Sequence, residues 1–407
     1  MSLAPWKGYW RLWSQLTAGR IVPIVPAAWL SLGLAGGVFG QEAVPQMQAY
    51  SSTVPWTGGT VADALGQVVV GTTIPMSSYA VAFGKGGAYT GVLVGSDPFA
   101  ASPGSVTLDA VLIPLVVQII TPNGTLVTFD PTKKNNCDGG VSALTRFKQS
   151  PLVVKSKLTF NGVSVGSHQY IDGFMRAEFW SVIQGTGFGD PISWSYAPAF
   201  TLPPFLSATG IVIGSGCNQM GIVSKDFMDA QLNLLPIPLL QAAGTISPTQ
   251  FAAFLLKNVV MSSADPPTST ACCIYGYHSA VGSPVQTYGA MDYDTTGRLG
   301  NVHDTSGPAH EIGEWMNDPL VTNATPAWGH IGQVSGCQSN LEVGDPLSGT
   351  NMPVITLSGY SYHVQELAFF SWFFNSKTTP SLGAGGEFSG NGTFKGPAKA
   401  CPPGGTF

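Results

Sequence analysis

The chain has 407 residues, a formal net charge of −5 at neutral pH and only 10% charged residues. It contains no cluster of Lys and Arg, so it lacks the electrostatic footprint that nucleic-acid binding requires. Hydrophobic residues make up 44% of the chain, which also has 51 glycines and 31 prolines. This composition predicts a loop-rich, compact protein with enough apolar residues for a large core.

Residues 1–40 predict a secretory signal peptide. Basic residues precede an apolar stretch at 21–39, which ends in small residues with a candidate cleavage site at 38–40. The alternative is a membrane anchor, because the stretch approaches the length that spans a bilayer, but Pro23, Pro26 and several glycines disfavour it. No later segment has the length and apolarity of a membrane-spanning helix. We therefore expect a secreted protein, extracellular or periplasmic, with no stable membrane insertion after the signal is removed.

The cysteines fit export into an oxidising compartment. They are Cys137, Cys217, Cys272, Cys273, Cys337 and Cys401. Their even number allows every cysteine to be paired, but the sequence leaves the pairing open. A zinc site made of cysteines is disfavoured because no C-x-x-C pair occurs. We expect Cys401 to tie the Gly/Pro-rich tail at 381–407 to the body of the protein.

The first third of the chain predicts β-structure. Residues 78–94 are typical of a hairpin around a glycine-rich turn. Residues 106–129 predict a second hairpin, with its turn at Pro122-Asn123-Gly124. We therefore expect a β-rich N-terminal part at 41–135.

Helices are expected mainly later in the chain, at 168–180, 226–235, 308–316 and 365–374. In addition, Ser247-Pro248-Thr249-Gln250 fits a capping box with proline at the first helical position, and predicts an apolar helix ending near Val260. Strands followed by helices favour an α+β fold. The region 136–380 would carry the catalytic part. We expect it to form one body with 75–135, although Asn135-Asn136 is a candidate boundary.

The run His310-Glu311-Ile312-Gly313-Glu314 is the most informative motif in the chain. On a helix, His310 and Glu314 lie on one face about one turn apart, so both side chains can reach one metal ion. Glu311 lies about 100° away around the axis, where it can accept a proton from water activated by the metal. The spacing resembles the zincin signature H-E-x-x-H, with glutamate replacing the second histidine. A solvated surface helix is the less favoured interpretation, because charged residues are so few.

A third protein ligand is expected downstream, because a catalytic zinc usually keeps three protein ligands and one open position. Glu342 is the first candidate and Asp345 the second. Asp345 also suits a turn before Pro346, which is the alternative for that residue. His330 and His363 are weaker candidates for the same position.

Residues 273–279 predict a strand that contains two tyrosines and His278. His278 is more typical of a hydrogen-bonded histidine in a strand than of a group that stabilises an oxyanion, but the second role stays an alternative. His303, just before the predicted metal-binding helix, either lines a cleft or caps the helix.

The acidic motifs belong to a longer series. The run at 310–314, Asn317-Asp318-Pro319, Trp328 and the run at 342–345 follow one another in that order. The series resembles the H-E-L-A-E, N-P, W and E-I-G-D motifs of the exordium-like (phosphate-induced) secreted proteins and their bacterial relatives. This resemblance implies a secreted protein with a zincin-like metal site at His310, Glu314 and Glu342, and with Glu311 as the base. It extends over most of the chain from about residue 75 to 375.

The sequence therefore predicts a secreted zinc-dependent hydrolase, most simply a metallopeptidase acting on peptides or proteins, with Glu311 as general base. Its metal ligands would be His310, Glu314 and either Glu342 or Asp345. The fold would be α+β, with a β-rich N-terminal part followed by a zincin-like catalytic region. One alternative is a non-catalytic cell-surface protein with a structural or vestigial metal site, since members of the resembling family are growth-related extracellular proteins. The other is a glycoside hydrolase with paired carboxylates.

Overall fold

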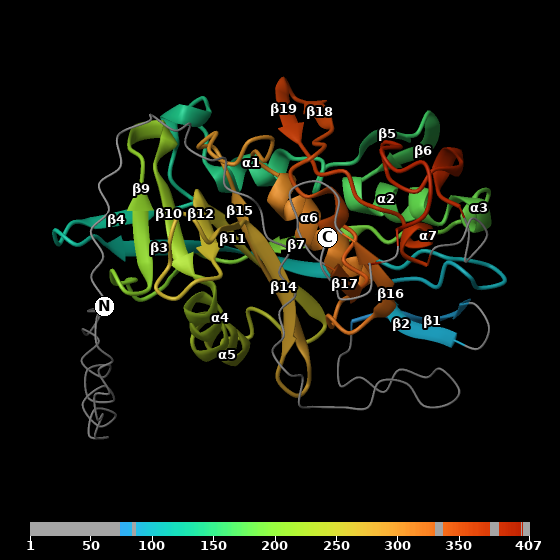
Figure 1. Cartoon of the computed structure of the whole chain (residues 1–407), viewed down its shortest axis with the longest axis horizontal. Helices are drawn as coiled ribbons and strands as arrows, with labels where there is room; N and C mark the ends of the chain where they lie inside the picture. The colour runs from blue at the N-terminus through green and yellow to red at the C-terminus, as the bar shows by residue number, and fades with distance from the viewer. Residues whose placement is uncertain (1–73, 84–86, 330–336, 375–381, 400, 402–407) are drawn as a thin grey trace, which may run out of the picture. The chain divides into compact units, whose positions relative to one another are not determined.

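The computed structural model describes residues 74–83, 87–329, 337–374, 382–399 and 401. The predicted signal peptide at 1–40, and residues 41–73 of the predicted β-rich part, lie outside these described residues. Strands are many and helices are few (Figure 1). The prediction of an α+β fold is therefore confirmed. All described residues belong to one compact unit.

A seven-stranded sheet forms the centre of the described fold (Figure 1). Its order is β14-β15-β11-β3-β4, and β7 and β8 also pair with β3. β11 is parallel to β15 and β3, whereas β14 and β4 are antiparallel to their neighbours. The strands are β3 (Leu108–Ile120), β4 (Leu126–Phe129), β7 (Ile192–Tyr196), β8 (Phe200–Thr201), β11 (Gln250–Lys257), β14 (Gly276–Val281) and β15 (Gln286–Tyr293).

Smaller sheets and short helices complete the described fold. A four-stranded sheet has the order β13-β12-β10-β9, and the other strands form two-stranded pairs. These strands are β1 (Met76–Phe83), β2 (Gly87–Val94), β5 (Ser156–Phe160), β6 (Val163–His168), β9 (Gly210–Ile213), β10 (Met220–Ser224), β12 (Val259–Ser262), β13 (Cys272–Ile274), β16 (Ala324–Gly329), β17 (Cys337–Asn340), β18 (Val354–Leu357) and β19 (Tyr360–His363). The α-helices are α1 (Ala143–Gln149), α2 (Tyr170–Glu178), α3 (Trp180–Ile183), α4 (Lys225–Leu234), α5 (Pro236–Ala242), α6 (Ser306–Asn317) and α7 (Phe370–Phe373).

The predicted helix from Pro248 to about Val260 is wrong. This segment forms β11 in the middle of the central sheet and then enters β12. Residues 251–256 have no exposed surface. A short run that is apolar on every side has no periodicity that separates a buried strand from a buried helix. The segment forms a strand because it pairs with β3 and β15, and β3 lies far away in the sequence.

Of the other predicted helices, three are present and one is mostly absent. Residues 168–180 form α2 and the start of α3, 226–235 correspond to α4, and 308–316 correspond to α6. The helix predicted at 365–374 is mostly wrong, because only α7 is helical there. The Glu366 amide donates to the Asn351 carbonyl at 3.1 Å, and the Ala368 amide donates to the Val343 carbonyl at 2.8 Å. These bonds to other loops replace the bonds that a helix would make within itself.

Both predicted hairpins are present. β1 pairs antiparallel with β2, and β3 pairs antiparallel with β4. The first turn, at 84–86, lies outside the described residues. β3 and β4 precede residue 135, yet they belong to the same sheet as β11 and β15. The central sheet thus spans the candidate boundary at Asn135-Asn136.

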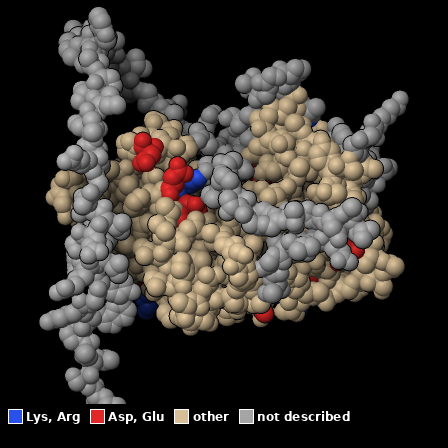
Figure 2. All heavy atoms as spheres, turned by 90° about the horizontal axis from the view of Figure 1, so that it is seen from below, with Lys and Arg blue, Asp and Glu red and all other residues tan. Residues whose placement is uncertain are grey.

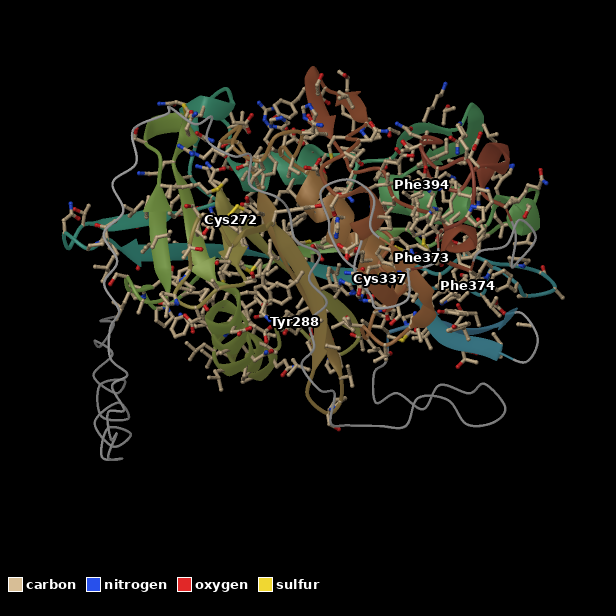
Figure 3. All side chains as sticks on the ribbon, in the orientation of Figure 1. Cys272, Tyr288, Cys337, Phe373, Phe374 and Phe394 are labelled. Carbon is tan, nitrogen blue, oxygen red and sulfur yellow. A yellow bond between two sulfur atoms is a disulfide. The ribbon has the colours of Figure 1, made fainter. Side chains whose placement is uncertain are left out.

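Disulfides pair the cysteines that the sequence left unassigned (Figure 3). The bonds are Cys137–Cys217, Cys272–Cys273 and Cys337–Cys401. The last of these joins the tail to β17, so the prediction that Cys401 ties the tail to the body is confirmed. The tail is also held by Glu366, whose carboxylate accepts a hydrogen bond from the Asn391 amide at 2.7 Å.

Charged side chains are sparse on the face shown in Figure 2. Most glutamates are instead buried, each at most 4% exposed: Glu178, Glu311, Glu314, Glu342 and Glu366. A buried carboxylate is unfavourable unless donors or cations surround it, so these residues need partners. Within the described part of the chain, no helix has the length and apolarity to cross a membrane.

Asp190 gives a test of pH-dependent stability. Its side chain is buried, and burial raises its pKa to about 7, although the Ser96 amide donates to it at 2.9 Å. The unfolded chain releases this proton near pH ~4, so the stability that protonation gives is present below pH ~4 and is lost as the pH rises toward ~7. Asp190→Asn removes this loss, because the amide stays neutral. The variant should match the wild type near pH 4 and be up to roughly 4 kcal/mol more stable near pH 8.

Urea unfolding at both pH values measures this difference directly. Other titrating groups affect the wild type and the variant alike, so they cancel in the comparison. A difference in the free energy of unfolding that is the same at both pH values would show that folding does not raise the pKa of Asp190.

Candidate metal centre

Helix α6 carries the H-E-x-x-E motif in the interior of the protein. All of its residues are buried, and it packs on β14, β15 and α2. Pro308 lies in the first turn, where a missing amide costs no helical hydrogen bond. Trp315 stacks on Phe251 of β11 with ring centroids 4.3 Å apart. Packing of its apolar residues therefore fixes the helix, so the polar residues of the motif are held against β14 and the loop after β17.

His310, Glu314 and Asp345 form a first group of potential metal ligands. His310 Nε2 lies 3.0 Å from Glu314 Oε1 and 3.6 Å from Asp345 Oδ1. One ligand atom from each of the three residues lies within 4.8 Å of the others. Together with Glu311 they line a cavity of ≈ 20 Å³. This volume is enough for a single water molecule or ion.

The other side of the His310 ring is held by neutral groups. Nδ1 lies 2.8 Å from the Tyr275 hydroxyl and 3.0 Å from Gln365 Oε1. Gln365 Nε2 donates in turn to the Gly344 carbonyl at 2.6 Å. These contacts leave Nε2 facing the carboxylates. A hydrogen-bond partner on the second ring nitrogen is typical of a metal-binding histidine.

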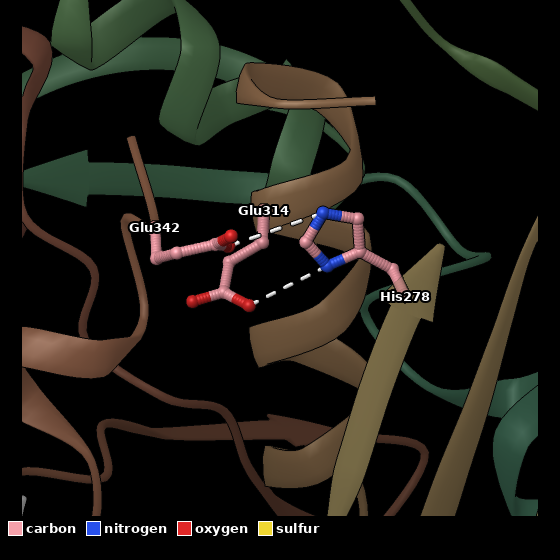
Figure 4. A group of neighbouring side chains, drawn as sticks. All are labelled: His278, Glu314 and Glu342. Carbon is pink, nitrogen blue, oxygen red and sulfur yellow. Dashed lines mark ion pairs between the residues drawn. The ribbon is translucent and has the colours of Figure 1, made fainter. Parts of the chain in front are cut away.

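His278, Glu314 and Glu342 form a second group (Figure 4). His278 Nδ1 lies 3.6 Å from Glu314 Oε2, and its Nε2 lies 3.9 Å from Glu342 Oε2. One ligand atom from each residue again lies within 4.8 Å of the others. Figure 4 shows the imidazole reaching from β14 toward the two carboxylates, so strand, helix and loop meet at Glu314.

The structure places the two candidates for the third ligand in different groups. Asp345, the second candidate from the sequence, lies with His310 and Glu314. Glu342, the first candidate, lies with His278 and Glu314 instead. All five side chains are nevertheless within one continuous buried cluster.

The loop that carries Asp345 is built around Glu314. The amides of Gly344 and Asp345 donate to Glu314 Oε1 at 3.1 and 3.2 Å. A Cβ at Gly344 would lie 2.5 Å from His310 Nδ1, so only glycine lets the loop approach this closely. The turn after Glu342 is therefore part of the site, because it carries Asp345 to His310.

Three of the other histidines are placed as follows. His363 lies outside both groups, since its Nδ1 pairs with Asp304 Oδ2 at 2.6 Å. His330 lies outside the described residues. His278 was expected only as a hydrogen-bonded histidine of a strand or as an oxyanion stabiliser. The strand is present as β14, but the sequence reasoning missed that His278 is a potential ligand.

Glu311 lies beside the ligand atoms of both histidines. Its Oε1 is 3.9 Å from His310 Nε2, and its Oε2 is 3.5 Å from His278 Nδ1. A Cβ at Gly276 would lie 2.5 Å from Glu311 Oε1, so a glycine on β14 makes room for the carboxylate. Among the described residues, Oε2 accepts no hydrogen bond. A buried carboxylate oxygen without a donor is unfavourable, and a cation or a water molecule is the partner that suits it.

The carboxylates and imidazoles strongly affect one another. Burial alone would lower the pKa of His310. The negative charges of Glu314 and Glu311 outweigh this effect and raise the pKa above its usual value, to about 10. Burial, followed by repulsion from Glu314, raises the pKa of Asp345 to about 8 and holds that of Glu342 well above its usual range. The cluster therefore carries more carboxylates than its own imidazoles neutralise.

The donor set suits a metal ion. None of the ion pairs in the described part of the chain joins a Lys or Arg to Glu311, Glu314, Glu342 or Asp345. Imidazole nitrogen combined with carboxylate oxygen is a common ligand set for Zn²⁺ and other divalent transition metals. These buried His, Glu and Asp groups could therefore hold a metal ion, and in its absence they form ion pairs with one another.

Comparison of the chain with protein-family models, with curated proteins and with solved structures finds no match. These comparisons neither support nor contradict the resemblance of the acidic motifs to the exordium-like proteins. The functional interpretation therefore depends on the geometry of the site itself.

Proposed function

We propose that the protein is a secreted zinc-dependent hydrolase, and within that class a metallopeptidase. The main support is that His310, Glu314 and Asp345 converge on one small cavity that Glu311 also lines. Three protein ligands with a base beside them are what zinc-assisted hydrolysis requires. The zincin-like and exordium-like resemblance of the motifs is consistent with this proposal.

Glu311 is the proposed general base. When bound by the first group, Zn²⁺ supplies Lewis acidity, which polarises a substrate carbonyl and lowers the pKa of water toward ~7. Glu311 Oε1 lies 3.9 Å from His310 Nε2, so its carboxylate can take a proton from a water molecule in the same cavity. His278 Nδ1 lies 3.5 Å from Glu311 Oε2, so His278 borders the proposed base. The proton can then pass from Glu311 to the leaving amine.

The ligand set sets a limit on the rate. Glu314 and Asp345 would neutralise most of the charge of a divalent ion, which weakens its Lewis acidity relative to a site with two histidines. We therefore expect slow turnover and a narrow substrate range.

Peptides are the substrate class that the strand arrangement favours. β14 is the last strand in the described order of the central sheet, and it carries Gly276 and His278 beside the site. An extended peptide can add to a strand at the edge of a sheet through backbone hydrogen bonds. Such pairing would bring a peptide bond to the polar face of α6.

Export is the second part of the proposal. Three disulfides among the described residues are typical of a protein that folds in an oxidising compartment. The sequence at 1–40 supplies a candidate signal. Sequencing the N-terminus of the protein recovered from outside the cell tests this, and the mature chain should begin near residue 41.

Metal removal tests the enzymatic proposal. Purified full-length protein should contain zinc, cleave members of a broad peptide library, lose activity after dialysis against a chelator, and regain activity with Zn²⁺. Glu178→Gln alters a buried glutamate of α2 outside the site and serves as the matched control. Zinc-loaded, folded protein that cleaves nothing in a broad peptide library would reject the peptidase assignment.

A structural ion in a non-catalytic secreted protein is the second candidate. It is favoured by burial, because His310, Glu311, Glu314 and Asp345 are each at most 5% exposed. A chelator separates the two functions. Under this alternative, removing the ion lowers the melting temperature of a protein that has no hydrolytic activity at any stage.

Gln365→Met should weaken zinc binding by roughly 10- to 100-fold. Gln365 contacts His310 Nδ1 and donates to the Gly344 carbonyl, so it links His310 to the loop that carries Asp345. Methionine has a similar volume but makes neither hydrogen bond. Competition with a chromophoric zinc chelator measures the affinity. Gln241→Met on α5 is the control, and an unchanged affinity in Gln365→Met would contradict the prediction.

A further inference from the structure

The two ligand groups share Glu314. Its Oε1 faces His310 Nε2 at 3.0 Å, and its Oε2 faces His278 Nδ1 at 3.6 Å. We propose that the site binds two divalent cations bridged by the Glu314 carboxylate. The second cation would be held by His278, Glu314 and Glu342. This inference rests on the proposed function for its first cation, and adds a second metal site that the mechanism above does not use.

The hydrogen bonds of both imidazoles favour this arrangement. His278 Nε2 lies 2.9 Å from the carbonyl oxygen of Asp318. A carbonyl oxygen can only accept, so Nε2 carries the proton and the lone pair of the neutral ring is on Nδ1. For His310, the acceptor Gln365 Oε1 lies 3.0 Å from Nδ1, which leaves the lone pair on Nε2. Each histidine therefore directs its lone pair to a different oxygen of Glu314.

Glu342 provides independent support. It is only 2% exposed, and its Oε1 accepts a hydrogen bond from Asn340 Nδ2 at 2.8 Å. Its Oε2 accepts no hydrogen bond among the described residues, and one ligand atom each of Glu342, Glu314 and His278 lie within 4.8 Å of one another. A buried carboxylate oxygen without a donor is costly. A cation in the second group would give this atom a partner.

The charges point to two ions rather than one. Glu311, Glu314, Glu342 and Asp345 each lie within 4.0 Å of an imidazole nitrogen. Ionised, they carry one negative charge each, which two divalent cations neutralise while both imidazoles stay neutral. A single divalent cation would neutralise only half of this charge, so the remaining buried carboxylates would have to be protonated.

A bridged pair would also place Glu311 usefully. Hydrolytic sites with two metal ions hold them about 3.5–4 Å apart and use both to stabilise charge in the transition state. The two oxygens of Glu311 face different histidines, at 3.9 Å from His310 and 3.5 Å from His278. Glu311 would therefore lie beside both ions and remain free of both ligand groups.

Metal stoichiometry tests the proposal. Full-length protein is stripped with a chelator, titrated with Zn²⁺ and analysed for bound zinc by mass spectrometry of the metal. We expect two ions per chain in the wild type, one in Glu342→Gln, and two in the control Glu178→Gln. A wild type that saturates at one ion, or Glu342→Gln that still binds two, would overturn the proposal.

Manganese gives a second readout that does not depend on activity. Two Mn²⁺ ions bridged by one carboxylate are exchange-coupled, so their electron paramagnetic resonance spectrum differs from that of an isolated ion. The coupled signal should appear in the wild type and be replaced by an isolated-ion signal in Glu342→Gln. An isolated-ion signal alone in manganese-saturated wild type would contradict bridging.

These outcomes separate the two proposals. Two bound ions without hydrolysis would leave the second site standing and reject the peptidase assignment. Zinc-dependent hydrolysis with one ion would do the reverse, and protein that binds no ion rejects both. If Glu342→Gln fails to fold, Asn340→Leu removes only the hydrogen bond that orients Glu342. It should weaken the second zinc-binding step by roughly 10- to 100-fold and leave the first unchanged.

Discussion

Glu311→Gln should lower kcat for peptide hydrolysis by roughly 10²- to 10⁴-fold while the protein keeps its bound metal. Glutamine has nearly the shape of glutamate but cannot take a proton from water. Glu311 belongs to neither ligand group, so the metal content should stay at the wild-type value. The measurement is kcat and bound metal per chain on the same preparation, because the prediction concerns the difference between the two.

The buried control is Glu178→Gln, whose carboxylate accepts a hydrogen bond from the Phe370 amide and lies outside the site. It should keep both activity and metal. Loss of metal together with activity in Glu311→Gln would make Glu311 a ligand instead of a base. Full activity in a metal-loaded Glu311→Gln protein would refute the proposed mechanism.

The part of the site that the sequence predicts is the part encoded locally. His310 and Glu314 are four residues apart, and helix geometry alone brings them together. Pro308 at the first helical position and the stop at Asn317-Asp318-Pro319 were enough to predict the helix. The third ligand is different, because the path of a loop decides whether Glu342 or Asp345 reaches His310. The amides of residues 344 and 345 set that path by donating to Glu314, and no local rule predicts such a contact.

His278 was missed for a related reason. It comes from β14, which lies beside α6 only because β14 pairs with β15 and α6 packs on both. One histidine in a strand is more often hydrogen-bonded than metal-binding. The useful signal would have been that the strand places Gly276 two residues before His278, since a glycine in a strand often marks a close approach by another group.

The fold shows the same division. Hairpins that depend on neighbouring residues, such as β1–β2 and β3–β4, were predicted correctly. β11 was predicted as a helix, because its apolar run fits both structures and its parallel partners are remote in sequence. The largest error in the predicted fold, at β11, and the failure to predict His278 as a potential ligand therefore have the same cause. Both depend on contacts between residues that are far apart in the sequence.

Glu314→Gln should abolish binding of both ions, which distinguishes it from every other ligand substitution. The amides of Gly344 and Asp345 both point at Oε1, so they should select the carbonyl oxygen of the glutamine for that position. The NH2 group then takes the position of Oε2 and faces His278. A donor there cannot bind a cation, and the first group keeps only a neutral oxygen in place of a carboxylate.

The loop should stay folded, because the glutamine oxygen still accepts both amide bonds, and circular dichroism of the metal-free variant should match that of the metal-free wild type. In zinc titrations, Asp345→Asn should lose the first ion, Glu342→Gln the second, and Glu314→Gln both, with affinities more than about 100-fold weaker than in the wild type. This pattern can arise only if one carboxylate serves two ions. If Glu314→Gln still bound one ion tightly, the two groups would be independent, and Glu314 would belong to only one of them.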